Sequence, residues 1–150
     1  MYAHAWHWHR GTPIPVPPND CGPTDLLPLL QSEQERVGIA AAYDLAAFGA
    51  EVVPSLIQTL SSQSEMTRRH AAYALSAVSA YAVDALVETL QSADPGTRTD
   101  AATILGDIGY AATPGVDALI DATKDAEATV RQRAAEALGI ISRSPAPVPA

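Results

Sequence analysis

The chain has 150 residues, 47% of them hydrophobic, which is the size and composition of one ordinary globular domain. Nine Lys and Arg against seventeen Asp and Glu give a net charge of -8, which repels phosphate backbones and anionic lipids and argues against nucleic acid or a membrane as partner. A single cysteine, Cys21, no secretory signal pattern at the start and no apolar run of membrane-spanning length lead us to expect a soluble, cytoplasmic protein.

Residues 1–23 are expected to form an arm or linker rich in His, Trp and Pro. If "HAWHWHR" (His4–Arg10) is extended, side-chain alternation puts His7 and His9 on one face, where two imidazoles can share a divalent metal. Other donors nearby are few, namely His4, Asp20 and Cys21. We favour the alternative, an aromatic strand that packs on another element, although a strand with two tryptophans needs a sheet and the sequence offers none.

One pattern recurs four times over residues 24–142. Alanine pairs begin at Ala41, Ala71, Ala101 and Ala134, a leucine follows four residues later, and an aliphatic pair stands fifteen residues before. The spacings of 30, 30 and 33 residues indicate stacked structural repeats. We place the first to fourth repeats at residues 24–49, 50–79, 80–109 and 110–142, followed by a flexible tail over residues 143–150.

Each repeat reads as two helices, because apolar residues fall at helical spacing in both halves. Asp94-Pro95 and Thr113-Pro114 are typical of a capping residue followed by a proline at the first helical position. Pro28 and Pro54 are expected in first turns, and Gly49 and Gly109 in left-handed conformations that end second helices.

These features predict an all-α, right-handed α-solenoid of four two-helix repeats, with an irregular N-terminal arm and a Pro-rich C-terminal tail. The small alanine columns let second helices approach closely, and Leu75 and Leu105 are expected to be buried between repeats.

Two segments, "TRTDAATILGDIG" (Thr97–Gly109) and "VRQRAAEALGIIS" (Val130–Ser142), resemble the short HEAT-like repeats of phycocyanobilin lyase subunits and of many bacterial proteins. The recurrent arginine of that family is matched by Arg68, Arg98 and Arg131, whereas the first repeat has Gly38 in this column. The resemblance implies an all-helical binding scaffold of the armadillo-like kind, and it brings no catalytic motif. We expect the arginines to brace neighbouring repeats or helix ends.

Residues 1–20 also resemble the linker that follows a phytanoyl-CoA dioxygenase-like domain, although the iron-binding His-x-Asp pair of that family is absent. The leading hypothesis is a non-catalytic scaffold that binds a protein partner through its concave second-helix face and uses no cofactor. The alternatives are a helical C-terminal extension of such an oxygenase and, after it, a bilin lyase-type subunit. The candidate partner-binding residues are Tyr43, Arg69, His70 and Tyr73, and no catalytic residue is proposed.

Overall fold

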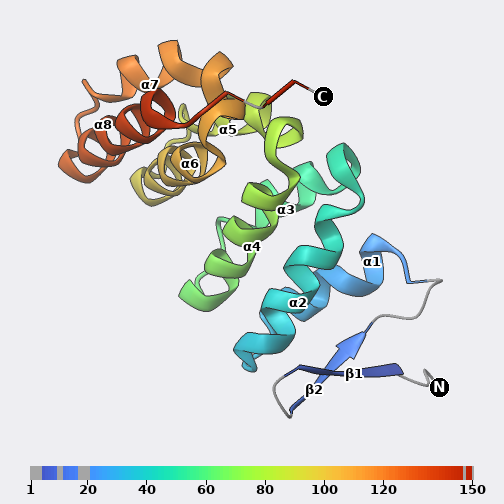
Figure 1. The fold of residues 1–150 in the computed structure, drawn as a ribbon. Coiled ribbons are helices and arrows are strands. Elements are labelled where there is room, and N and C mark those ends of the chain that lie inside the picture. Colours follow the sequence, from blue (N-terminus) through green and yellow to red (C-terminus); the bar gives the residue numbers. More distant parts are fainter. Residues whose placement is uncertain (1–4, 10–11, 17–20, 147, 150) are drawn as a thin grey trace. The chain divides into compact units, whose positions relative to one another are not determined.

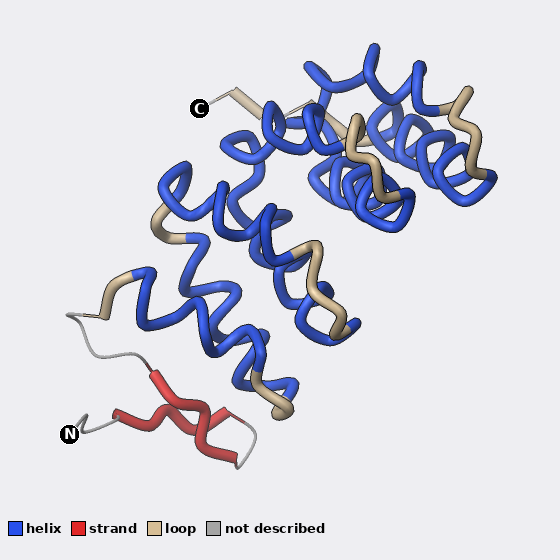
Figure 2. Tube along the Cα trace, turned by 180° about the vertical axis from the view of Figure 1, so that it is seen from behind, coloured by secondary structure: helices blue, strands red, loops and turns tan. Residues whose placement is uncertain are grey.

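Helices account for most of the chain (Figure 1), and they follow one another in pairs joined by short loops (Figure 2). The computed structural model describes residues 5–9, 12–16, 21–146 and 148–149, and for the first two ranges it describes the backbone only. The chain divides into two compact units, Met1–Ala74 and Leu75–Ala150, with the boundary inside helix α4 (Glu65–Val78). The predicted all-α fold class is confirmed.

The first unit holds two strands and then two pairs of helices, some of them preceded by a 3-10 turn. In chain order its elements before α4 are β1 (Ala5–His9), β2 (Thr12–Val16), α1 (Pro23–Leu26), η1 (Leu27–Gln31), α2 (Glu35–Ala46), η2 (Gly49–Val52) and α3 (Val53–Thr59). Pro28 and Pro54 lie in the first turns of η1 and α3, where a proline loses no helical hydrogen bond. Both positions confirm the sequence-based expectation.

The second unit contains two further helix pairs, each preceded by a 3-10 turn. Its elements after α4 are η3 (Ser79–Ala82), α5 (Val83–Thr89), α6 (Pro95–Ile108), η4 (Gly109–Gly115), α7 (Val116–Ala122) and α8 (Ala128–Arg143). The second helices α6 and α8 approach closely, since a Cβ added at Gly106 would lie only 3.0 Å from the Cα of Ala137. Small residues on the facing helices are what permits this contact.

The core follows the columns of the sequence pattern. Leu45, Leu75 and Leu105, each four residues after the first alanine of a pair, are all fully buried. The predicted burial of Leu75 and Leu105 is therefore confirmed. Removing such a side chain leaves a cavity, so this column carries a large share of the stability of the array.

One predicted helix cap is confirmed and another is wrong. Asp94 Oδ2 accepts a hydrogen bond from the backbone N–H of Thr97 at 2.8 Å, and Pro95 occupies the first turn of α6. Thr113 caps no helix, because its hydroxyl donates to the carbonyl of Tyr110 within η4. Pro114 consequently lies inside η4, since the chain already turns helically before α7 begins.

The ends of three second helices share a left-handed residue in one column. Gly49 and Gly109 have φ of 58° and 73°, as the sequence predicted, and Ser79 takes φ of 55° in the same column. A non-glycine residue in this conformation stores strain of order 1 kcal/mol.

The N-terminal arm, predicted to be irregular, contains the favoured aromatic strand as β1 and a second strand, β2, that was not expected. β1 and β2 pair in antiparallel register from Ala5 opposite Val16 to His9 opposite Thr12, and β2 lies beside α2. The prediction that the aromatic strand has no sheet to join within this chain is therefore wrong. Pro13 and Pro15 stand at alternate positions of β2, so both can turn the side that lacks an N–H donor away from β1.

We predict that Ser79→Gly stabilises the protein by up to ~1 kcal/mol, because glycine adopts a positive φ without a Cβ clash. Gly49→Ala, which introduces a Cβ at the equivalent position, should destabilise by a similar amount. Urea unfolding followed by circular dichroism measures both changes. A destabilised Ser79→Gly variant would show that the serine hydroxyl matters more than backbone strain.

Candidate functional site

Tyr43 and Tyr73 occupy the same column on the second helices α2 and α4, two residues after Ala41 and Ala71. Two residues along a helix rotate the side chain by about 200°, so a tyrosine in this column faces away from the buried alanine. Tyr43 is 59% exposed and Tyr73 is 39% exposed. The structure thus presents two large aromatic side chains at equivalent positions of neighbouring repeats.

Arg69 shares a helical stripe with Tyr73, since the two residues stand four apart on α4. Its Nη2 donates to Oε1 of Glu65 at 3.0 Å, and the two side chains are 48% and 77% exposed. An ion pair this exposed contributes about 0.3–0.5 kcal/mol, so little is lost if Arg69 exchanges Glu65 for another carboxylate. Arg69 and the two tyrosines form a surface that we call the tyrosine ridge.

His70 does not belong to this ridge, and its assignment to an exposed surface is wrong. The side chain is fully buried, and its Nδ1 lies 2.8 Å from the carbonyl oxygen of Leu30. The physical reason lies on α2, where a Cβ at Gly38 would come within 2.0 Å of His70 Cε1. The missing side chain at Gly38 leaves the space that the imidazole fills.

The sequence contained one signal for this packing. Gly38 stands where the other repeats have arginine, and a glycine in place of a long side chain leaves room for a residue of the neighbouring helix. The column of His70 gives no indication of burial, because it holds the charged residues Asp100 and Arg133 in later repeats. The second ring nitrogen of His70, Nε2, is buried without a hydrogen-bond partner in this part of the structure.

The tyrosine column continues in the second unit with small or charged residues. The hydroxyl of Thr103 donates to the carbonyl of Thr99 at 2.9 Å. Glu136 accepts hydrogen bonds from Gln132 and Arg133, which lower its pKa below the usual value. Both side chains are satisfied within their own helix, and neither offers aromatic surface to a partner.

The suggested metal pair falls outside what the structure describes. His7 and His9 lie in β1, for which only the backbone is described. Among the residues with described side chains, no group of three or more His, Cys, Asp and Glu is placed to hold a metal ion. The idea of a site at His7 and His9 stays a prediction.

The stretch Glu65–Thr89 is long and apolar enough to pass as a membrane-crossing helix by length and composition alone. This is weak evidence, because core helices of soluble proteins pass the same test. The stretch comprises α4, η3 and α5, and the left-handed Ser79 interrupts it. Its apolar residues Leu75 and Leu86 are fully buried within the protein.

Comparisons with known proteins agree with this architecture. The family model of HEAT repeats matches residues 83–150, and none of the curated proteins matches significantly. The complex of CpcE and CpcF of phycocyanin lyase from Nostoc sp. PCC7120 has a similar structure, with a TM-score of 0.56 and 21% identity over 82% of this chain and 79% of the other. Residues 83–150 thus match HEAT repeats, and a similar helical repeat fold extends over most of the chain.

Human deoxyhypusine hydroxylase, solved in complex with glycerol, is also similar, with a TM-score of 0.61 and 23% identity. The similarity covers 95% of this chain and 51% of the hydroxylase, so the HEAT-like chain spans about half the length of that enzyme. At these identities the two structures establish a shared fold.

The recurrent arginines of the HEAT-like repeats have the bracing role that the sequence predicted. Arg68, Arg98 and Arg131 each donate from Nη1 to a loop carbonyl six residues earlier, at 2.7, 2.8 and 2.7 Å. These bonds tie the start of each second helix to the loop before it. Because the same bond recurs at the same column, the arginines have a structural role within each repeat.

Arg98 makes an additional contact that links the third and fourth repeats. Its Nε and Nη2 donate to the two carboxylate oxygens of Asp125 at 2.9 and 3.0 Å, and the side chains are only 17% and 14% exposed. The hydrogen bonds from Arg98 lower the pKa of Asp125, and the same pair raises the pKa of Arg98. The equivalent positions in earlier repeats are serines, so this two-pronged ion pair is specific to Asp125.

Gly38→Ala should destabilise the protein by ~1–3 kcal/mol, because the new methyl group overlaps the imidazole of His70. In a His70→Ala background the same change should be neutral or stabilising, since alanine is the better helix former. A double-mutant cycle measured by urea unfolding compares the two. Equal effects of Gly38→Ala in both backgrounds would contradict the packing described here.

Asp125→Asn should lower the free energy of unfolding at neutral pH, because it removes the carboxylate that pairs with Arg98. A carboxylate whose pKa is lowered on folding stabilises above its unfolded pKa, and this gain disappears as the pH falls through the lower folded pKa. The difference from wild type should therefore vanish in acid, below the usual value of 3.8.

Glu136→Gln is the matched control, since the Arg133–Glu136 pair is about half exposed. Exposed pairs contribute little, so Glu136→Gln should change stability less than Asp125→Asn at pH 7. An Asp125→Asn effect that persisted unchanged in acid would assign its origin to something other than the ion pair.

Proposed function

We propose that this HEAT-like chain is a non-catalytic scaffold that holds a protein partner against the tyrosine ridge. The observation that carries the proposal is the exposure of Tyr43 and Tyr73 at one column of successive second helices, with Arg69 beside Tyr73. Tyrosine and arginine are both enriched among the residues that anchor protein interfaces, and tyrosine offers a large contact area with few rotatable bonds.

The ridge also has the electrostatic and energetic properties of a docking surface. Arg69 can exchange the exposed carboxylate of Glu65 for one on a partner at small cost, so a partner with an acidic group near an apolar contact fits best. The net charge of -8 makes nucleic acid and anionic membranes poorer candidates than a protein.

Two similar structures carry enzyme names, a phycocyanin lyase complex and a deoxyhypusine hydroxylase. At 21% and 23% identity this likeness supports the helical repeat fold alone, and we do not extend either activity to this chain. The proposal therefore rests on the surface residues.

The partner can be found by placing a photo-crosslinking amino acid at Tyr43, with the same substitution at Tyr81 as a matched control. Tyr81 is 68% exposed but lies in η3, off the second-helix face. A partner of the ridge should crosslink from position 43 and not from position 81 in a lysate of the native host. Identical products from both positions would count against a specific ridge.

With the partner in hand, Tyr43→Ala combined with Tyr73→Ala should weaken binding by ~30-fold, equivalent to about 2 kcal/mol. The melting temperature should change little, because exposed substitutions shift stability by about half a kcal/mol. Thr103→Ala combined with Glu136→Ala is the control pair and should bind as wild type does. Unchanged affinity of the tyrosine variant would remove the ridge from consideration.

A further inference from the structure

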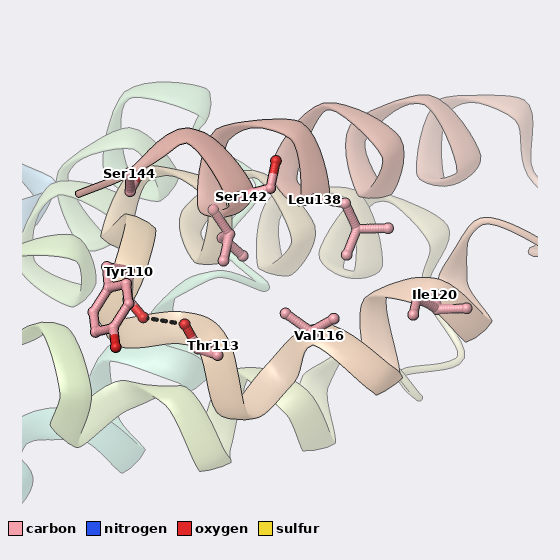
Figure 3. A pocket seen from close by; sticks show the side chains of 8 residues that line it. Tyr110, Thr113, Val116, Ile120, Leu138, Ser142 and Ser144 are labelled. Carbon is pink, nitrogen blue, oxygen red and sulfur yellow. Dashed lines mark hydrogen bonds between the residues drawn. The ribbon is translucent and has the colours of Figure 1, made fainter. Parts of the chain in front are cut away.

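The fourth repeat presents an open groove of about 500 Å³ between α8 and the η4–α7 segment. Figure 3 shows Leu138 on α8 and Val116 on α7 pointing into the space between these helices, with Tyr110 at one end. Ile120 also lines the groove and is 44% exposed. The lining is mainly apolar, while Ser142 and Thr113 contribute hydroxyl groups.

The apolar residues of this groove belong to columns that are covered in an earlier repeat. Leu138 is the counterpart of Leu105, which is fully buried, and Ile120 is the counterpart of Val87. Leu105 and Val87 both pack on Gly115 of the next repeat, where a Cβ would lie 3.6 and 3.2 Å from their side chains. These two columns are therefore the surface on which a following helix pair normally stacks.

A third column shows the same difference. Ala42 and Ala102 are fully buried on their second helices, whereas Ala135 at the equivalent position of α8 is exposed. The end face formed by Val116, Ile120, Ala135 and Leu138 thus continues the repeat-to-repeat interface, and no helix of the described chain is stacked on it. Of the described residues after α8, Ser144 lines the groove, and those beyond it are exposed, with Val148 at 91%.

Charge identifies what can cover this end face. The sequence from Tyr110 onward is almost neutral, with five acidic residues (Asp117, Asp121, Asp125, Glu127 and Glu136) against four basic ones (Lys124, Arg131, Arg133 and Arg143). The rest of the chain carries nearly all of the net charge of -8. Two copies of this acidic protein therefore repel each other least where their end faces meet.

We propose that the end face is a homodimer interface, in which α7 and α8 of one chain pack on α7 and α8 of a second copy. A two-fold arrangement uses the same residues on both chains and closes after two copies. A head-to-tail arrangement is less suitable, because β2 already lies beside α2, the second helix of the first repeat. Thr113 and Ser142, which line the groove, supply the polar rim that surrounds an apolar interface centre.

Sedimentation velocity over a concentration series from low micromolar to several hundred micromolar tests this proposal. The wild-type chain should pass from monomer to dimer and stop there. Ile120→Glu should raise the dimer dissociation constant at least about tenfold, because it places a carboxylate in a contact that excludes water. Circular dichroism checks that the variant keeps its helix content.

Ala135→Arg is a second variant, chosen because Ala135 is exposed in the monomer and tolerates a long side chain there. It should also prevent dimerisation, while Tyr81→Glu, an exposed position of the same unit away from the groove, should dimerise as wild type does. A wild-type chain that stays monomeric throughout would overturn the proposal. Dimers that survive both Ile120→Glu and Ala135→Arg would overturn it as well, and neither outcome depends on the tyrosine ridge.

Discussion

The need to bury an apolar stripe that no single helix pair can cover alone governs this structure. Leu45, Leu75 and Leu105 are fully buried, while their counterpart Leu138 in the fourth repeat is partly exposed. The difference arises because a following repeat covers the earlier leucines, whereas no described residue stacks on the outer side of the fourth repeat. The stability of the array and the open end face thus have one cause, since each repeat needs a neighbour to cover its apolar residues.

In each of the two units, one residue that departs from the repeat pattern makes an additional contact between repeats. In the first unit, Gly38 replaces the recurrent arginine and makes room for the buried His70, whose ring joins α4 to the carbonyl of Leu30. In the second unit, Asp125 replaces a serine and ties the fourth repeat to Arg98 of the third. Each exception adds a contact between consecutive repeats that the repeated residues do not make.

The two proposed surfaces differ in kind. The tyrosine ridge consists of exposed positions on second helices that lie outside the core columns, so its residues can change without loss of packing. The end face consists of core columns themselves, and its side chains are exposed because no described residue of the chain packs on them. A partner on the ridge and a second copy on the end face would engage different units of the chain, so each surface can be altered independently of the other.

The sequence by itself determined the all-α fold, the left-handed Gly49 and Gly109, the cap at Asp94 and the bracing by the arginines, because each depends on residues close in sequence. The tertiary structure decided what neighbouring repeats do to one another. His70 stands in a column of polar residues, and only the glycine on the adjacent helix makes it a core residue. The strand partner of β1 was likewise missed. Two prolines in Thr12–Val16 argue against a strand, unless it is an edge strand whose prolines turn the side without an N–H away from its partner. Burial and pairing across elements depend on contacts between distant residues, and a single sequence records such contacts only indirectly.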